Sequence, residues 1–446
     1  MRDPQSLDKQ YLWHPFTQMQ DWLENEQLVI EKGKGIYLYD TKGQRYIDGI
    51  SSLWVTVHGH RHQELNRAIT KQLNKVAHTT LLGLANLPSI ELAEKLIKIS
   101  PPGLKKVFFS DNGSTAVEIA LKIAFQYQQL KGYKDKKSFL TLVNAYHGDT
   151  IGSVSVGGID LFHKIYKPLL FKAFKAPAPY CYRCPLGLDK KNCKMSCLNC
   201  VERILKKHHS KIAAMIVEPM IQAAAGMLTM PGGYLKAIRA LCSKYDVLLI
   251  CDEVATGFGR TGKMFACEQE GISPDLMCVA KGVTGGYLPL AATLTSQKIF
   301  DAFLGEISEQ KTFFHGHTYT GNPLACAAAI ANLELFKKDK TLNKIKSKIN
   351  FMEKELKTFH DLKSVGDIRQ CGFMVGIELV KDKETKEEFP YEARIGHRVI
   401  LEARKRGAIL RPLGDVIVLM PPLSINQKQL QELLSITYES IKEIPA

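Results

Sequence analysis

The most informative stretch of the chain is Phe108-Phe-Ser-Asp-Asn-Gly-Ser-Thr-Ala-Val-Glu-Ile-Ala-Leu-Lys122. A short apolar run leads into Asp111-Asn-Gly113, and Ser114 and Thr115 then predict the start of a helix. A Gly-Ser pair at a helix N-terminus offers free backbone N–H groups, a hydroxyl and the positive end of the helix dipole, which together suit a phosphate. Ser and Thr are also ordinary N-cap residues, so this feature alone leaves a purely structural interpretation open.

Around this stretch, short apolar runs alternate with helical patterns. Such alternation indicates βαβ units and a parallel sheet. The runs are mostly apolar on both faces, as is typical of strands that helices cover on both sides. The expected strands cover residues 106–109, 139–143, 213–217, 247–251, 276–280 and 290–294.

The two ends of the chain predict a second, smaller α+β domain. Its expected elements are a hairpin at 36–39 and 44–47, a long helical stretch over 322–357, strands at 373–379 and 416–419 and a helix near 427–441. An isolated hairpin is only marginally stable, so the first element should pack with the later ones. We therefore expect an α/β fold with a mostly parallel central sheet in a large domain, 71–335, and a small domain built from 1–70 and 336–446.

Composition and charge exclude several classes of protein. The chain has 446 residues, of which 45% are hydrophobic and 24% charged, as in ordinary globular proteins. It has no long uncharged apolar run, so no membrane span is expected, and no apolar segment near residue 1, so we expect a cytoplasmic location. The net charge of +15 comes mainly from scattered lysines rather than from a basic patch, so we expect no nucleic-acid partner.

Three more residues that carry chemistry follow expected strands. Asp252 follows one strand, Lys281 follows the next and stands beside glycines, and Tyr146 lies in the loop after an earlier strand. The carboxyl ends of parallel strands meet at a ligand crevice. Pyridoxal phosphate (PLP) requires a phosphate cradle, a lysine for a Schiff base, an acid for the ring nitrogen and an aromatic ring for stacking. Each residue alone also has a structural interpretation, but their joint occurrence favours a PLP site.

Longer segments surround these residues. They are Trp13-His-Pro-Phe-Thr-Gln-Met19, Ser51-Ser-Leu-Trp54 with His58-Gly-His60, Tyr146-His-Gly-Asp-Thr150, Asp252-Glu-Val-Ala-Thr-Gly-Phe-Gly-Arg-Thr-Gly262, His315-Gly-His-Thr318 with Gly321-Asn-Pro323, and Arg411-Pro-Leu-Gly414 with Met420-Pro-Pro422. Through them the chain resembles the class III aminotransferases, the ω-amino group of the fold-type I PLP enzymes, over essentially its whole length. Within that family it is similar to the members that act in biotin synthesis.

The resemblance implies a PLP-dependent homodimer that transfers an amino group to 8-amino-7-oxononanoate. It implies that Gly113 and Ser114 bind the cofactor phosphate and that Tyr146 stacks on the cofactor ring at the catalytic centre. It further implies that Asp252 pairs with the ring nitrogen and that Lys281 is the covalent partner and proton shuttle.

Further residues would contact the substrates. The resemblance implies that Gly316, His317 and Thr318 reach across the dimer interface to the partner's cofactor and substrate; the family usually has Pro at the middle position, so His317 is a departure. It also implies that Arg411 binds the carboxylate of the acceptor, a role that suits a guanidinium because it binds carboxylates bidentately.

The amino donor is left open between S-adenosylmethionine and lysine. Family members that use S-adenosylmethionine have Tyr, Trp and Tyr at the positions of Phe16, Leu53 and Val418 in this chain, whereas Trp54 is kept. The three differences remove a hydroxyl group at Phe16 and an aromatic ring at Leu53 and at Val418. Aromatic faces favour a sulfonium cation, so their partial loss weakens such a site, while a lysine donor needs mainly an apolar channel. Another ω-aminotransferase, acting on 4-aminobutyrate, ornithine or a diamine, is a second alternative; Trp13-His-Pro15 and Tyr146-His-Gly-Asp-Thr150 disfavour it.

A cluster of cysteines stands apart from the expected catalytic strands. Its spacing suits a thiolate metal site, but free thiols on a loop are the preferred interpretation. A zinc-binding nucleic-acid protein built on the cluster is disfavoured, because no Arg-rich or aromatic RNA-binding pattern accompanies it. The cluster consists of Cys181, Cys184, Cys193, Cys197 and Cys200.

Overall fold

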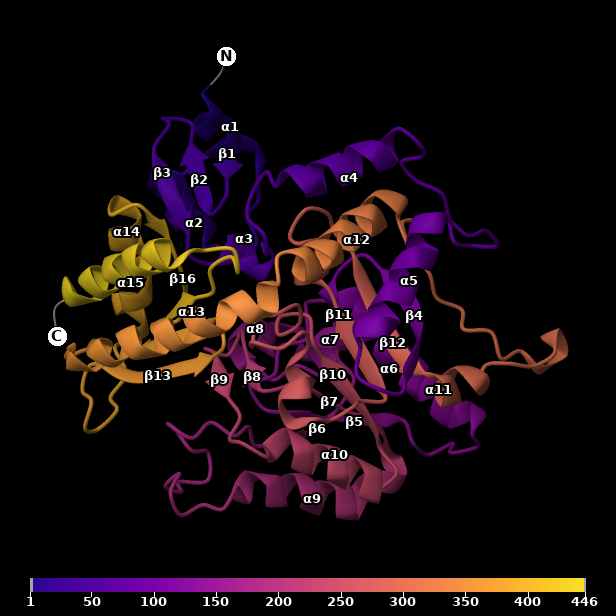
Figure 1. The fold of residues 1–446 in the computed structure, drawn as a ribbon. Coiled ribbons are helices and arrows are strands. Elements are labelled where there is room, and N and C mark those ends of the chain that lie inside the picture. Colours follow the sequence, from indigo (N-terminus) through magenta and orange to yellow (C-terminus); the bar gives the residue numbers. More distant parts are fainter. Residues whose placement is uncertain (1–2, 445–446) are drawn as a thin grey trace.

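A seven-stranded sheet forms the centre of the computed structural model, which describes residues 3–444 (Figure 1). In sheet order the strands are β4 (Leu104–Ser110), β12 (Ala291–Ser296), β11 (Leu276–Val279), β10 (Leu248–Asp252), β7 (Ile212–Val217), β5 (Ser138–Leu142) and β6 (Phe174–Ala176). Strands β11, β10, β7, β5 and β6 run parallel, and β12 is antiparallel to both of its neighbours. The predicted mostly parallel α/β sheet is confirmed, and only the short β6 was not expected.

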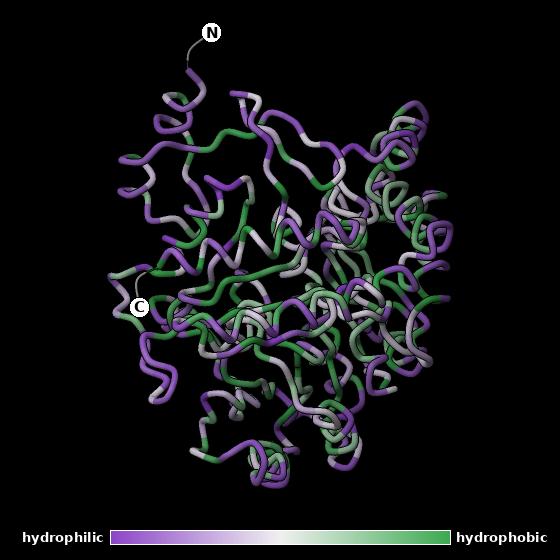
Figure 2. Tube along the Cα trace, turned by 60° about the vertical axis from the view of Figure 1, so that its left-hand side comes forward, coloured by the Kyte–Doolittle hydropathy of each residue, from purple (hydrophilic) through white to green (hydrophobic). Residues whose placement is uncertain are grey.

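Helices cover both faces of this sheet because its strands are apolar on both sides. On β7, Ala214 and Ile216 pack with α6 (Gly113–Leu130), whereas Met215 and Val217 face the opposite core. The opposite core includes residues of α5 (Leu87–Ile99), α9 (Ser196–His208) and α10 (Tyr234–Lys244). Figure 2 shows apolar residues concentrated in the interior and hydrophilic ones prevailing at the periphery.

Segments from both chain ends form two smaller sheets beside the large one. Strands β1 (Ile30–Lys34), β2 (Tyr37–Asp40) and β3 (Arg45–Asp48) are joined by β15 (Ala408–Ile409), and β13 (Val365–Cys371), β14 (Met374–Leu379), β17 (Val416–Leu419) and β16 (Arg411–Leu413) form the other sheet. The N-terminal hairpin thus pairs directly with a C-terminal strand. Helices α14 (Ile395–Lys405) and α15 (Gln427–Lys442) pack against each other beside these sheets. The domain boundaries at residues 70 and 335 stay a prediction.

One expected element is wrong. The helical stretch predicted over 322–357 is two helices, α12 (Pro323–Lys338) and α13 (Thr341–Leu356). They are separated because Lys340 has a left-handed backbone, with φ of 51°. No Gly or Pro stands between the two helices, so the sequence pattern does not indicate the break.

The remaining elements are short or peripheral. They are α1 (Pro4–Tyr11), α2 (Met19–Glu24), α3 (Ser51–Trp54), α4 (Gln63–Leu73), α7 (Ile151–Ser155), α8 (Asp160–His163), α11 (Gln297–Asp301), β8 (Ile221–Gln222) and β9 (Leu228–Thr229). Within residues 3–444, no helix combines the length and the apolar character needed to cross a membrane.

Candidate active site

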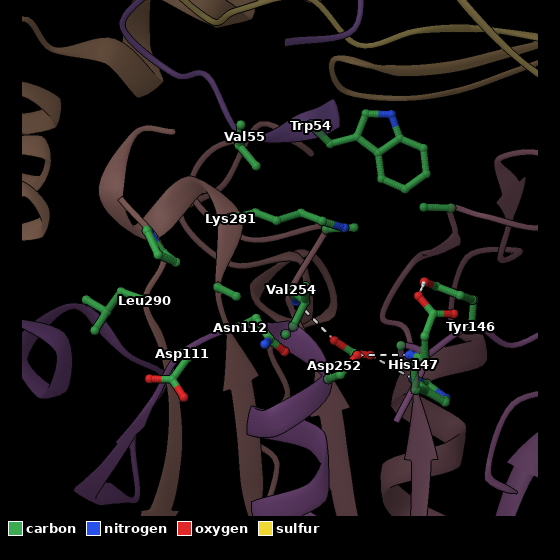
Figure 3. A pocket seen from close by; sticks show the side chains of 18 of the residues that line it. Trp54, Val55, Asp111, Asn112, Tyr146, His147, Asp252, Val254, Lys281 and Leu290 are labelled. Carbon is green, nitrogen blue, oxygen red and sulfur yellow. Dashed lines mark hydrogen bonds and ion pairs between the residues drawn. The ribbon is translucent and has the colours of Figure 1, made fainter. Parts of the chain in front are cut away.

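A cavity of about 700 Å³ opens where five strands of the central sheet end (Figure 3). Its lining includes residues that end or directly follow β4, β7, β10 and β11, and residues of the loop after β5. Of the residues predicted for the site, it brings together Trp54, Gly113, Ser114, Tyr146, Asp252 and Lys281. Phe16, Leu53, Gly316, His317, Thr318 and Arg411 are not part of this lining.

The N-terminus of α6 forms one wall of the cavity. The helix begins at Gly113, so the predicted helix start at Ser114 and Thr115 is confirmed, and its N-cap is Asn112: the Asn112 side chain accepts the Thr115 N–H at 3.1 Å, and the Thr115 hydroxyl accepts the Asn112 N–H at 3.1 Å. The capping box satisfies the N–H groups of Asn112 and Thr115, and those of Gly113 and Ser114 have no intrahelical partner. A Cβ on Gly113 would lie 2.5 Å from Val254 Cγ1, so any larger residue at this position would clash with Val254.

The loop after β5 is fastened to that helix end. Ser114 Oγ accepts the backbone N–H of Asp149 at 2.9 Å. Gly148 has a φ of 117°, and a Cβ there would lie 1.9 Å from Ser114 Oγ, so only glycine permits this approach. Tyr146 in the same loop donates its hydroxyl to Asp149 Oδ2 at 2.6 Å, and burial raises the pKa of Tyr146.

Asp252 is held at the cavity floor by a histidine that the sequence reasoning missed. His147 Nδ1 lies 2.7 Å from Asp252 Oδ2, and Oδ1 accepts the Val254 N–H at 3.1 Å (Figure 3). Both side chains are buried, and His147 Nε2 has no partner. His147 directly follows Tyr146 in the quoted segment, but nothing in the local sequence indicates its pairing with Asp252, which lies 105 residues away.

A second buried acid stands beside this pair. Glu218 accepts the N–H groups of Tyr146 at 3.0 Å and Ala223 at 2.9 Å. Burial raises the pKa of Glu218 to about 7; the charge of Asp252 adds to the rise, and His147 opposes it. Burial therefore favours the protonated form of Glu218 more than that of an exposed glutamate.

Lys281 lies in the loop after β11, with a left-handed φ of 47°. Its Nζ is 4.8 Å from the centroid of the Trp54 ring, and Figure 3 shows the side chain crossing the cavity below that ring. Burial lowers the pKa of Lys281 to about 8, with Arg260 and Arg411 lowering it and Asp252 and Glu218 raising it. A lowered pKa increases the fraction of neutral, nucleophilic amine.

The segment that carries Trp54 is strained. Ser51, Ser52, Leu53 and Trp54 all have positive φ angles, between 50° and 80°. Such left-handed conformations are costly for residues with a Cβ and persist only where the surroundings hold them. The turn buries Trp54, and Leu53 is 46% exposed.

Arg411 stands on β16, opposite Val418 of β17. Its Nε is buried without a partner, and burial lowers its pKa, which the nearby Tyr146 opposes. Val418 is fully buried in an apolar cluster with Trp54 and Met420, so it faces the core rather than the cavity.

Two other predicted groups lie farther out. Phe16 is 59% exposed, and its ring contacts Phe162 edge-on at 5.4 Å; Phe162 in turn contacts Tyr146 at 6.3 Å. In the loop before α12, His317 Nδ1 lies 2.6 Å from Asp111 Oδ2 of the same chain, and Asp111 lines the cavity. An aromatic row and the His317–Asp111 contact thus connect both groups to the cavity rim.

The cysteine cluster is remote from this chemistry. Cys181, Cys184, Cys193 and Cys197 line a separate cavity of about 20 Å³. In the described part of the chain, no three His, Cys, Asp or Glu side chains are placed so that they could hold a metal ion. Burial raises the pKa of Cys181, and that of Cys197 to about 11, which disfavours the thiolate form that metals bind.

Comparisons with known proteins agree on one family. The family model for class III aminotransferases matches residues 19–441. The adenosylmethionine-8-amino-7-oxononanoate aminotransferase of Aquifex aeolicus is 57% identical over 446 residues, covering 99% of this chain and 98% of the relative.

Solved structures place the chain in the same group. The enzyme of the same name from Methanocaldococcus jannaschii has a TM-score of 0.94 at 48% identity and 98% coverage of both chains. An amine transaminase from an uncultivated Pseudomonas species, solved in a PLP-bound form, has a TM-score of 0.91 at 35% identity, covering 96% of this chain and 98% of that one. These similarities extend over nearly the full length and include every strand that lines the cavity. The chain therefore belongs to the class III aminotransferases.

Proposed function

We propose that this chain is a PLP-dependent aminotransferase that converts 8-amino-7-oxononanoate to 7,8-diaminononanoate in biotin synthesis. The observation that carries the proposal is the buried amine of Lys281, which faces the cavity together with the Asp252–His147 pair. The names of relatives that are 52–57% identical over nearly the whole chain support the choice of substrate.

The residues of the cavity fit PLP. The open N-terminus of α6, with Gly113 and Ser114, suits a phosphate dianion. Asp252 offers a carboxylate to the ring nitrogen, and His147 fixes its orientation. The aromatic ring of Tyr146 lines the same space, as does the Lys281 amine that would hold the cofactor covalently.

PLP, when bound, supplies an electron sink for the electrons released as a proton leaves the carbon beside the donor amine. The chain must then move that proton. With its pKa lowered to about 8, the Nζ of Lys281 can accept a proton from the donor carbon and later deliver one to the former ketone carbon of the acceptor. The Asp252 carboxylate would pair with the positively charged ring nitrogen, and His147 orients that carboxylate. The Trp54 ring covers Nζ.

We assign the acceptor carboxylate to Arg411 and the donor to either S-adenosylmethionine or lysine. Arg411 has a buried, unpartnered Nε, and Tyr146, which lines the cavity, opposes the lowering of its pKa. The printed names of the relatives favour S-adenosylmethionine. Lysine stays an alternative donor because neither Phe16 nor Leu53 lines the cavity. Neither residue therefore presents an aromatic face to the sulfonium of S-adenosylmethionine.

A homodimer is part of the proposal. Large apolar side chains are exposed on the α4–α5 connection and the loop before α12, including Leu82 (88%), Ile307 (98%) and Phe314 (81%). Exposed apolar side chains of this size mark interaction surfaces. The loop carries Gly316, His317 and Thr318, which we expect to complete the partner's site.

We also place the enzyme in the cytoplasm. All eleven cysteines lie within the described residues, and none of them forms a disulfide. Free thiols in this number suit a reducing compartment.

Borohydride reduction tests the cofactor assignment directly. Treatment of the PLP-loaded protein should add one pyridoxyl phosphate group to the peptide that contains Lys281, as measured by mass spectrometry. Lys348 provides the matched control, because its pKa is also lowered to about 8 by burial although it lies outside the cavity. Modification of another lysine, or of none, would contradict the proposal.

A further inference from the structure

One fully buried side chain of α12 bonds to the loop that carries Lys281. Asn332 lies in the middle of this helix and has an exposed fraction of 0%. Its Nδ2 donates to the carbonyls of Gly282 at 2.9 Å and Val283 at 3.0 Å, the two residues that directly follow Lys281. Both hydrogens of one amide group are therefore used on the backbone of this loop.

The oxygen of the same side chain faces the end of the loop. Gly285 has a left-handed φ of 67°, and a Cβ there would lie 2.9 Å from Asn332 Oδ1, so this approach requires glycine. Oδ1 is buried and accepts no hydrogen bond from the described part of the chain. Burying an amide with an unsatisfied oxygen is costly, so the two bonds that Nδ2 donates must offset that cost.

The loop needs this support because it begins with a strained residue. Lys281 has a left-handed φ of 47°, which is costly for a residue with a Cβ and persists only where the surroundings hold it. It opens a single 3₁₀ turn, Lys281–Thr284, and hydrogen bonds in such turns have poor geometry. The two bonds from α12 therefore hold the backbone from which the Lys281 side chain crosses the cavity (Figure 3).

The backbone of Asn332 is held in turn. His58 Nε2 lies 3.3 Å from the Asn332 carbonyl, and the His58 ring packs edge-on against Phe336 of the same helix at 5.2 Å. Burial lowers the pKa of His58 to about 4, so the ring is neutral near pH 7 and donates from Nε2 to this carbonyl. One residue of α12 thus contacts both the loop of Lys281 and the segment that follows Trp54, whose ring covers Nζ.

We propose that Asn332 is a positioning residue that fixes Lys281 in the cavity by binding the carbonyls of Gly282 and Val283 from α12. Its effect on turnover rests on the proposed function. Its effect on the surroundings of the Lys281 amine requires bound PLP but no substrate, so the two effects can fail separately.

The test measures the visible absorption of the full-length, PLP-loaded protein as a function of pH. The absorption band of PLP bound through Lys281 responds to protonation of the linking nitrogen, so its midpoint reports on the surroundings of Nζ. Asn332→Leu keeps a side chain of similar size but removes both donated bonds, so the loop loosens and solvent reaches the nitrogen. Solvent favours the charged form, so the midpoint should rise by at least about half a pH unit. The kcat should fall at least about tenfold, while the KM for 8-amino-7-oxononanoate changes by less than about twofold.

Gln128→Met is the matched control. Gln128 is also a buried amide on a helix, α6, whose Nε2 donates to the carbonyl of Ala213 at 3.1 Å and whose Oε1 has no partner in the described part of the chain. It lies outside the cavity. Its replacement should lower the free energy of unfolding without moving the absorption midpoint or kcat. Asn332→Ala removes the same two bonds as Asn332→Leu, should shift the midpoint in the same direction, and serves if the leucine variant does not fold.

An absorption midpoint that is the same in both Asn332 variants as in the unmodified protein would overturn the inference, whatever their loss of stability. An equal shift of the midpoint in Gln128→Met would overturn it as well. An unmodified protein that shows the absorption band but does not convert 8-amino-7-oxononanoate would instead refute the proposed function and leave the comparison of midpoints valid.

Discussion

Replacing Lys281 by methionine should abolish turnover and yet stabilise the cofactor-free protein near neutral pH. Burial lowers the pKa of Lys281 from 10.5 to about 8. That difference is about 2.5 pH units, and one unit corresponds to about 1.36 kcal/mol, so keeping a lysine there costs at most about 3 kcal/mol at pH 7. Methionine has similar length and no charge, and it removes this cost.

The sign of the pH dependence follows from linkage. Between pH 8 and 10.5 the unfolded chain binds more protons at Lys281 than the folded chain does, so the free energy of unfolding rises with pH in this window. Lys281→Met lacks this contribution. Its advantage of up to about 3 kcal/mol at pH 7 should therefore shrink above pH 8 and vanish near pH 10.5.

Urea unfolding of both proteins without cofactor, at pH 7 and at pH 10, measures this difference. Lys348→Met is the matched control: the pKa of Lys348 is also lowered to about 8, but its Nζ donates to the carbonyls of Leu423 at 2.5 Å and Ile425 at 2.9 Å. Its loss leaves two carbonyls without a donor, so this variant should be less stable than the parent. The reasoning would be refuted if Lys281→Met were no more stable than the parent protein at pH 7, or if it exceeded the parent's stability by the same amount at pH 7 and at pH 10.

Three further predictions concern catalysis. Asp252→Asn should keep the fold and lower kcat at least about a hundredfold, the scale of one lost preorganised electrostatic partner; near-normal rates would mean that another acid pairs with the cofactor. Arg411→Ala should weaken the acceptor half-reaction by about 1.5–3 kcal/mol and spare the donor half-reaction in single-turnover measurements; equal losses in both halves would exclude a role in acceptor recognition. Phe16→Tyr combined with Leu53→Trp should shift the ratio of kcat/KM values toward S-adenosylmethionine over lysine, and an unchanged ratio would show that these positions do not select the donor.

The parts of the fold that were predictable depend on local pattern. The expected large-sheet strands at 106–109, 139–143, 213–217, 247–251, 276–280 and 290–294 correspond to β4, β5, β7, β10, β11 and β12, because runs that are apolar on both faces leave few alternatives. The cavity residues Asp252 and Lys281 were found for the same reason, since they directly follow such runs. Strand β6 was missed because it has three residues, of which only Ala176 is buried.

The parts that were not predictable depend on contacts distant in sequence or on a second subunit. His147 was missed because its pairing with Asp252 joins loops 105 residues apart. Asn332 looks like one residue of a helix until Gly282 and Val283 approach it in three dimensions. The position of Phe16 relative to the cavity depends on how the N-terminal segment packs, and that of Gly316–Thr318 depends on the proposed dimer. Neither produces a periodic pattern of apolar residues in the sequence.

The central claim is amino transfer to 8-amino-7-oxononanoate, and product formation tests it most directly. The purified, PLP-loaded protein is incubated with this acceptor and with either S-adenosylmethionine or lysine, and 7,8-diaminononanoate is measured by mass spectrometry beside a Lys281→Ala control. We predict product with at least one of the two donors and none with the control. Absence of product with both donors, from protein that carries PLP on Lys281, would contradict the assignment.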